Sequence, residues 1–210
     1  MMNSSNNITL VIHGGSGRIY KEPMTDEKGS IYTKKLTEAL TSGFAVLQQG
    51  KSSVEAVEAA LKILEDSPLF NAGRGSVFNN AEVIELDAAV MDGNTMKAGA
   101  IAGAKTIKNP VSAARCVLEC SDYVMLSGSG AEQFAAENGL ELMDPSWLAT
   151  EERTMQIQEI KRNQADGSLP PNMSADISKY GTVGAVALDQ EGHLAAATST
   201  GGMLNKKYGR

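Results

Sequence analysis

Strand-like and helix-like segments occur in blocks along this sequence, and the order of the blocks limits the folds open to the chain. Short apolar runs rich in β-branched residues predict strands, and apolar residues at helical spacing predict amphipathic helices. The expected order is a strand (8–15), two helices (30–48 and 52–66), a hairpin (82–93 with 97–107), a helix (109–120), a short strand (123–128), a helix (129–139), a charged helix (151–162) and a second hairpin (182–189 with 193–199).

Local sequence marks the ends of several of these elements. Ser30 lies where an N-cap is expected for the first helix, and Ser52 with Glu55 forms a capping-box pattern before the second. Asp92-Gly93 is a pair typical of hairpin turns. Because strands and helices come in blocks rather than in regular alternation, we expect an α/β (α+β) fold in which an antiparallel or mixed sheet packs on helices.

The composition is that of a soluble globular domain. The 210 residues are 42% hydrophobic and 21% charged, which suffices for one domain with a sizeable core. The net charge of -6 leaves no basic excess to neutralise phosphates, so we expect no nucleic acid partner. No apolar run is long enough to span a bilayer, and the N-terminus lacks the apolar core of a signal peptide. We therefore expect a cytoplasmic protein without a membrane partner.

The cysteines and histidines indicate no metal site. Cys116 and Cys120 lie four residues apart in an expected helix, and we expect buried free thiols. His13 is expected to be a buried, hydrogen-bonded structural residue, with a role as the base of a nucleophile as the alternative, and His193 is expected to be exposed. Neither histidine has the spacing of a zinc site. The run HGGSG (13–17) follows a strand but matches no phosphate-binding loop.

The second hairpin begins at Gly181-Thr182, after a polar segment with glycine, proline and serine that extends from Asn163 to residue 180. This segment has few apolar anchors, so we expect it to be mobile. A Gly-Thr pair at the start of a buried strand has two interpretations. It is a turn that leads into the strand, or it is a bond that the protein cleaves in itself.

The second interpretation has a chemical basis. A threonine hydroxyl needs a base, and an N-terminal threonine supplies its own α-amine, with an unperturbed pKa of about 7.7–8.0. Thr182 lies within the chain, so its bond to Gly181 has to break first. The Thr182 hydroxyl can attack the Gly181 carbonyl in an N→O acyl shift, and glycine leaves that carbonyl accessible.

The next strand carries a second hydroxyl. Thr200 ends the run ATSTGG (197–202), and Gly201-Gly202 permits close backbone approach. A short turn pairs the two strands in antiparallel fashion, so Thr182 at the start of one strand is expected beside Thr200 at the end of the other. A second hydroxyl there can orient the nucleophile. The alternative is a strand-end threonine that satisfies the backbone.

Several longer motifs resemble the plant-type L-asparaginase/isoaspartyl peptidase family, a branch of the N-terminal-nucleophile (Ntn) hydrolases. They extend from Ile8 to Arg210 and comprise HGGSG, PLFNAGRGSVF, ELDAAVMDGNTMKAGAIAG, NPVSAAR, GTVGAVALD and AAATSTGGMLNKKYGR. Ser16 departs from the alanine that the family usually has there. The runs GTV and STGGM favour the isoaspartyl peptidase branch.

The resemblance implies a four-layer αββα sandwich and a precursor that cleaves itself into two subunits. Residues 1–210 would form a single Ntn-hydrolase domain, in which 1–181 is the α subunit, with a mobile linker at about 163–181, and 182–210 is the start of the β subunit. The complete enzyme is expected to be a dimer of such αβ units. No organic cofactor is implied.

The resemblance also implies site residues. Thr182 would be the nucleophile, Thr200 the second active-site threonine, and Asn71 an asparagine close to the nucleophile. Arg210 would bind the α-carboxylate of the substrate. A loop whose backbone carbonyls hold a structural sodium ion is implied at Leu64, Glu65, Ser67, Phe70, Ala72 and Arg74.

The implied substrates share one chemical feature. The side-chain amide of asparagine and the isoaspartyl peptide bond are both β-amides of aspartate. A site that binds the α-carboxylate through a bidentate arginine presents either amide to the same hydroxyl. The expected activity is therefore hydrolysis of asparagine and of β-aspartyl dipeptides.

Family members continue beyond the arginine that matches Arg210. The continuation includes an aspartate for the α-amine of the substrate, and a third threonine with a glycine that supplies the oxyanion hole. We therefore expect this chain to be a C-terminally truncated form of the enzyme that is inactive alone. The alternative is an inactive remnant that acts at most as a binding or structural protein.

Overall fold

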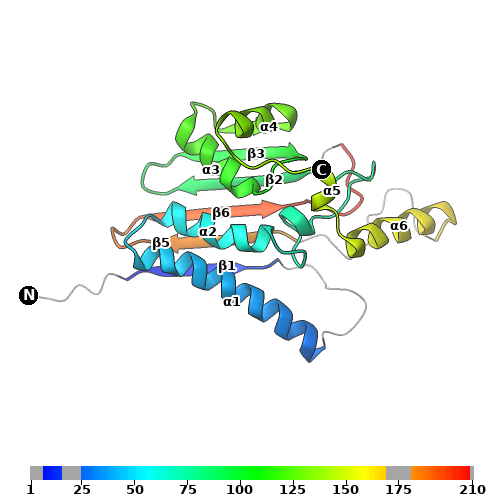
Figure 1. The fold of residues 1–210 in the computed structure, drawn as a ribbon, viewed down its shortest axis with the longest axis horizontal. Coiled ribbons are helices and arrows are strands. Elements are labelled where there is room, and N and C mark those ends of the chain that lie inside the picture. The colour runs from blue at the N-terminus through cyan, green and yellow to red at the C-terminus, as the bar shows by residue number, and fades with distance from the viewer. Residues whose placement is uncertain (1–6, 16–24, 169–180, 209–210) are drawn as a thin grey trace, which may run out of the picture.

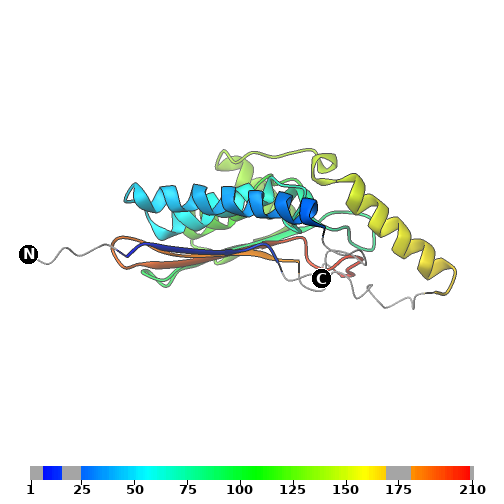
Figure 2. The same ribbon diagram turned by 90° about the horizontal axis from the view of Figure 1, so that it is seen from below.

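The computed structural model describes residues 7–15, 25–168 and 181–208 of the 210-residue chain. These residues form a six-stranded sheet with helices on one face (Figures 1 and 2). The strand order is β1-β5-β6-β2-β3-β4, in which β3 and β4 run parallel and all other neighbours run antiparallel. The predicted mixed sheet packed on helices is therefore confirmed.

The strands agree with the apolar runs of the sequence. Their bounds are Thr9–His13 (β1), Leu86–Asp92 (β2), Ala98–Ala104 (β3), Met125–Ser127 (β4), Val183–Leu188 (β5) and Leu194–Thr200 (β6). β5 and β6 form the second predicted hairpin, and β6 also pairs with β2 of the first. The C-terminal hairpin is thus inserted between β1 and β2 and occupies the middle of the sheet.

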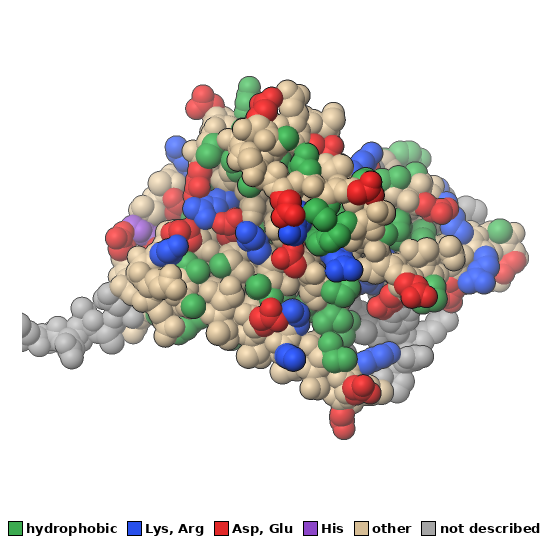
Figure 3. Space-filling model, viewed as in Figure 1, with side chains coloured by type: hydrophobic (Ala, Val, Ile, Leu, Met, Phe, Trp, Pro, Cys, Tyr) green, Lys and Arg blue, Asp and Glu red, His purple; other side chains and the backbone are tan. Residues whose placement is uncertain are grey.

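The helices cover this sheet from one side. Their bounds are Asp26–Gln48 (α1), Ser53–Glu65 (α2), Pro110–Cys120 (α3), Gly128–Glu137 (α4), Pro145–Leu148 (α5) and Glu151–Ala165 (α6), with a single 3-10 turn at Gly73–Gly75 (η1). The capping box at Ser52 and Glu55 is present as expected. Acidic and basic side chains are interspersed over the face seen in Figure 3.

Two predicted helix boundaries are wrong. The first helix begins at Asp26 rather than near Ser30, and the Thr25 hydroxyl caps it by accepting from the Lys28 N–H at 3.2 Å. Its first turn is polar, so apolar spacing could not reveal it. The charged helix α6 extends to Ala165, past the boundary expected at Asn163. Residues 169–180 of the segment expected to be mobile lie outside the described residues.

The core lies between the helices and one face of the sheet. Along β6, Ala195, Ala197 and Ser199 are buried, and the residues between them are more exposed. The small alanines allow α2 to pack close to the sheet, and α2 contributes the fully buried Val57 and Leu61. Burying each such aliphatic side chain contributes about 1.5–3 kcal/mol.

The opposite face of the sheet carries apolar side chains that no described helix covers. Val11 is 61% exposed, Val186 48% and Leu194 54%. The helices α1 to α4 lie on the other face, and α6 projects beyond the end of the sheet (Figure 2). None of the described helices has the length and apolar character needed to cross a membrane.

The cysteines are free thiols in α3, as expected, but they are not both buried. Cys116 is partly buried and Cys120 is exposed. Burial, together with the neighbouring Cys120 thiol, raises the pKa of Cys116 to about 11. Cys116 is therefore unreactive at neutral pH.

Candidate active site

The chain segments singled out in the sequence meet at one end of the sheet. Val183 pairs with Ser199 in the β5–β6 ladder, so the flanking Thr182 and Thr200 are neighbours just beyond that pair. Val183 and Ser199 are fully buried on the helix side. Since side chains alternate along a strand, both threonines lie on the opposite face. The hairpin therefore brings Thr182 and Thr200 together, as predicted.

Asn71 holds this end of the sheet together from the loop after α2. Its side-chain amide donates to the Gly202 carbonyl at 2.7 Å, and its backbone carbonyl accepts from the Gly201 N–H at 3.1 Å. Its side-chain oxygen accepts from the Val77 N–H at 3.0 Å. The Asn71 side chain is 6% exposed and has a fixed orientation. The turn after Thr200 is thereby attached to the α2–β2 loop.

Asn71 also contacts the predicted cleavage position. A Cβ on Gly181 would lie 2.8 Å from both Cβ and Nδ2 of Asn71. From the β1 side, a Cβ on Gly15 would lie 3.3 Å from the carbonyl oxygen of Thr182. Asn71 and Gly15 therefore border the Gly181–Thr182 bond, which lies between the loop after α2 and the end of β1.

The Thr200 hydroxyl has a local partner. Its oxygen accepts from the Gly202 N–H at 3.0 Å. This is the backbone-satisfying role that the sequence left as an alternative. The same hydroxyl keeps its own proton, which it can donate to a neighbouring group. The two roles of Thr200 are therefore compatible.

His13 is exposed, and the prediction that it is buried is wrong. It pairs with Gly184 across β1 and β5, and a Cβ on Gly184 would collide with its imidazole ring. The ring is accommodated on the bare face because Gly184 has no side chain. Its Nδ1 accepts from the Gly15 N–H at 3.3 Å. His193 is half-buried rather than fully exposed.

On the helix side of the sheet, the buried carboxyl of Glu65 faces Ser199, the residue before Thr200 on β6. Burial raises the pKa of Glu65 to about 8, even though Ser199, the Val111 N–H and Asn109 lower it. The Val111 N–H donates to Glu65 Oε1 at 2.9 Å. Glu65 Oε2 and Ser199 Oγ each lack a well-aligned hydrogen bond among the described residues. Burial thus favours the neutral form of the Glu65 carboxyl behind the threonines.

The loop expected to hold sodium has backbone carbonyls turned inward. The carbonyls of Glu65 and Phe70 occupy the space that a Cβ on Gly73 or Gly75 would fill. The carbonyls of Leu64 and Ala72 also accept local N–H groups at 3.2 Å. Carbonyl oxygens suit a hard cation, but these contacts do not test the sodium site, which stays a prediction. Among the described residues, no group of His, Cys, Asp and Glu side chains could hold a metal ion.

Arg210, the expected ligand of the substrate carboxylate, lies outside the described residues. Sequence reasoning overlooked two buried residues of the site. Ser76 lies against Gly201, and Lys206 lies against Gly202. Neither has a spacing or motif that distinguishes it from a surface residue. Their burial becomes visible only when the loops are in place.

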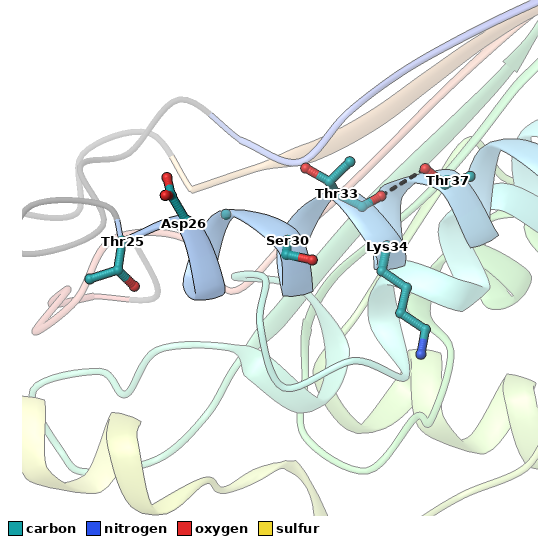
Figure 4. Close-up of a pocket in the computed structure, with 7 residues that line it drawn as sticks. Thr25, Asp26, Ser30, Thr33, Lys34 and Thr37 are labelled. Carbon is teal, nitrogen blue, oxygen red and sulfur yellow. Dashed lines mark hydrogen bonds between the residues drawn. The ribbon is translucent and has the colours of Figure 1, made fainter.

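Two hollows that the described residues line lie away from the Gly181–Thr182 bond. One, of about 620 Å³, extends along α1, and its labelled side chains belong to the N-terminal half of that helix (Figure 4). Within it, the Thr37 hydroxyl donates to the Thr33 carbonyl at 2.8 Å. Another, of about 520 Å³, lies between β2, β3 and α4 and is bordered by Tyr208. Neither hollow is lined by Gly181 or Thr182.

Comparison with known proteins gives a family match over nearly the whole chain. The family model described as asparaginase matches residues 6–210. The chain is 47% identical over 204 residues to the isoaspartyl peptidase of Escherichia coli, with 96% of this chain and 63% of that protein covered. It is 42% identical over 210 residues to the plant-type L-asparaginase of Pyrococcus abyssi, with 97% and 66% covered. The chain thus spans less than two thirds of the length of each relative.

Proposed function

Because the chain belongs to the asparaginase family, we propose that it is the self-cleaving part of an isoaspartyl peptidase/L-asparaginase that uses Thr182 as its nucleophile. The observation that carries this proposal is the register of β5 and β6. It puts the Gly181–Thr182 bond next to Thr200, with Asn71 packed against Gly181. The names of the relatives supply the substrate class.

Self-cleavage starts on the precursor. The Thr182 hydroxyl attacks the Gly181 carbonyl, its proton passes to the peptide nitrogen, and that nitrogen leaves as an amine, which converts the amide into an ester. Water then hydrolyses the ester and frees a carboxylate on Gly181 and the hydroxyl of Thr182, whose amine is already free. Asn71 holds Gly181 in place during this step, and the Thr200 hydroxyl orients Thr182 by a hydrogen bond.

Substrate hydrolysis uses the new N-terminus. The free amine of Thr182 takes the proton of its own hydroxyl, which attacks the β-amide carbon of the substrate. Ammonia leaves when the substrate is asparagine, and an amino acid leaves when it is a β-aspartyl dipeptide. Water releases aspartate from the resulting ester. Arg210 binds the substrate α-carboxylate with two parallel hydrogen bonds.

The family membership and the uncovered sheet face support a larger assembly. We infer that a second sheet covers this face in the complete protein and gives the four-layer αββα sandwich. The exposed Val11, Val186 and Leu194 suit such a contact, because exposed apolar patches mark interaction surfaces. A dimer of αβ units and a sodium ion held by the carbonyls of the loop after α2 complete the proposal.

An inactive chain that only binds or supports other proteins is the second candidate. The same uncovered apolar face favours it, because such a face can bind another protein. Reading the coding sequence beyond the codon for Arg210 distinguishes the two. A frame that continues into an aspartate-bearing loop and a later Thr-Gly segment supports the enzyme.

Activity tests the proposal directly. The protein expressed from its complete reading frame is assayed for ammonia release from asparagine and for aspartate release from a β-aspartyl dipeptide. We expect turnover that Thr182→Ala abolishes. Activity that persists in Thr182→Ala would contradict the proposed nucleophile.

A further inference from the structure

We propose that Lys206 is a positioning residue for the self-cleavage proposed above. Its buried side chain fixes the Gly201-Gly202 turn and, through that turn, the orientation of Thr200 and Asn71 beside the Gly181–Thr182 bond. The inference rests on the proposed function, because the position of the turn affects cleavage only if the Gly181–Thr182 bond is cleaved. The contacts that support it belong to the described residues.

The burial of Lys206 needs an explanation. Lysine is almost never fully buried unless it has a partner, because the ammonium group loses its hydration. Lys206 is 3% exposed, whereas the adjacent Lys207 is exposed. Burial also removes much of the conformational freedom of a long side chain. Specific contacts must offset both costs.

Those contacts lead to the start of β2. The Lys206 ammonium donates to the Glu85 carbonyl at 2.9 Å and lies 3.9 Å from Glu85 Oε2. On the way it passes beside Gly202, where a Cβ would lie 3.2 Å from both Cδ and Nζ of the lysine. Gly202 has φ +73°, a conformation that only glycine adopts easily. The turn after Thr200 is therefore packed directly on the lysine side chain.

Gly202 in turn connects to both groups at the bond. Its N–H donates to the Thr200 hydroxyl at 3.0 Å, and its carbonyl accepts from the Asn71 side chain at 2.7 Å. Asn71 is the residue that packs against Gly181. A displacement of Gly202 therefore disturbs Thr200 and Asn71 together, while Lys206 itself need not touch the reacting atoms.

The backbone around Lys206 is held independently of its side chain. The Lys206 carbonyl accepts from the Asn80 N–H at 2.8 Å, and the Lys206 N–H donates to the Met203 carbonyl at 3.1 Å. The side-chain amide of Asn80 also donates to Asn205 Oδ1 at 2.9 Å. A side-chain substitution at Lys206 should thus leave the course of the loop intact. It tests the side chain rather than the fold.

If Lys206 only stabilised the fold, a variant that restores stability would also restore the geometry of the Gly201-Gly202 turn. Removing Lys206 alone leaves Glu85, whose side chain is 15% exposed, without its cation. Replacing both partners with neutral groups of similar shape is often close to neutral for stability. The double variant Lys206→Met/Glu85→Gln should therefore regain stability. It should not regain the position of Gly202, because the ammonium group that packs beside Gly202 and is held there by the Glu85 carbonyl is still missing.

The experiment compares Lys206→Met, the double variant and Lys207→Met as the exposed control. The first readout is hydrogen exchange, by NMR, of the Gly202 N–H and the Asn71 side-chain amide in the uncut Thr182→Ala background. The second is the rate of Gly181–Thr182 cleavage with Thr182 intact. Thermal melting of each variant reports its stability.

We expect faster exchange at both amides and a cleavage rate reduced roughly 10- to 100-fold in Lys206→Met and in the double variant. The double variant should melt near the wild-type temperature, and Lys207→Met should match wild type throughout. If the amide exchange and the cleavage rate return to wild-type values together with stability in the double variant, the inference is overturned. Unchanged amide exchange in Lys206→Met would overturn the inference as well, and this readout does not require a protein that cleaves itself. A wild-type protein that does not cleave contradicts only the proposed function.

Discussion

Among single residues, Asn71 joins separate segments of the chain at the site. One side chain bonds the turn after Thr200 and packs against Gly181, so the position of the proposed nucleophile depends on the loop after α2. Glycine is the only residue that fits at 181 without displacing Asn71. The requirement for glycine before Thr182 is therefore steric as well as chemical.

Gly181→Ala should slow self-cleavage. The added methyl group would lie 2.8 Å from Asn71 and has to push it away. Overpacking of this kind costs about 1–3 kcal/mol, and about 1.4 kcal/mol corresponds to a tenfold change in rate. We expect cleavage to slow by about 5- to 150-fold, as followed by gel electrophoresis over time.

Gly130→Ala is the matched control, because a Cβ there meets no atom within 4 Å. This variant should cleave like wild type. Equal cleavage rates in Gly181→Ala and Gly130→Ala would show that the contact with Asn71 is irrelevant to the reaction.

Arg210→Lys should raise the KM of the complete enzyme. Lysine keeps the positive charge but loses the planar fork that binds a carboxylate with two hydrogen bonds. We expect KM for asparagine to rise by roughly tenfold or more, since hydrogen bonds to charged groups are worth about 1.5–3 kcal/mol each. Steady-state kinetics measures this, with exposed Lys207→Arg as the control. An unchanged KM would remove Arg210 from the substrate site.

At the scale of elements, the turn between β5 and β6 is tied to the start of α2 by one carboxylate. Asp189 accepts from the backbone N–H groups of Ser53 at 3.0 Å, Glu191 at 3.0 Å and His193 at 2.9 Å. Burial alone would raise the pKa of Asp189, but these hydrogen bonds outweigh it and hold the pKa below its usual range. The hairpin is thereby fixed to the helix layer at the end of the sheet remote from the site.

Asp189→Asn should destabilise the fold in a pH-dependent way. Because the folded pKa is lowered, the ionised carboxylate contributes stability above the unfolded pKa, about 3.9. This contribution is lost as the pH falls through the folded value. We expect the variant to lose about 1–3 kcal/mol at pH 7 and much less in strong acid.

Urea unfolding at both pH values measures the difference, with the exposed Asp122→Asn as the control. A loss of the same size at both pH values would show that the ionised form of Asp189 adds nothing.

The elements also show how far the sequence leads. The hairpins, the capping box of α2 and the pairing of Thr182 with Thr200 follow from apolar spacing and short turns, which are local features. The polar first turn of α1 gave no apolar pattern, so its start at Asp26 was missed. The contact between Asn71 and Gly181 joins residues far apart in the chain, so local patterns could not predict it, and only the family resemblance implied that Asn71 lies near the nucleophile. The burial of Lys206 also depends on a residue far away in the chain, Glu85, so local patterns could not predict it either.

In the molecule as a whole, the described helices that pack on the sheet cover one of its faces (Figure 2). Val11, Val186 and Leu194 are exposed on the other face, which no described helix covers. The block order of the sequence predicted helices packed on a sheet. It did not predict that the described helices in contact with the sheet would share one side, because the alternating strand pattern does not say what covers each face.

The 210-residue chain expressed alone should therefore self-associate. Exposed apolar sheet faces promote association, and Val11→Thr/Val186→Thr should reduce it, because threonine retains the β-branch but is polar. Light scattering after size exclusion measures the monomer fraction, which we expect to rise in the double variant. Ile31→Thr, at a 48% exposed position on helix α1, is the control and should leave the monomer fraction unchanged. A wild-type chain that is monomeric at high concentration would contradict this account of the bare face.

Self-cleavage at Gly181–Thr182 is tested by the intact mass of the purified protein, combined with N-terminal sequencing of its pieces. We expect two pieces, the second of which begins at Thr182. Thr182→Ala should give a single uncut chain, and Thr182→Ser should still cleave because it keeps a hydroxyl. An uncut wild-type chain, or a new N-terminus at any residue other than Thr182, would show that Thr182 is not released as the nucleophile.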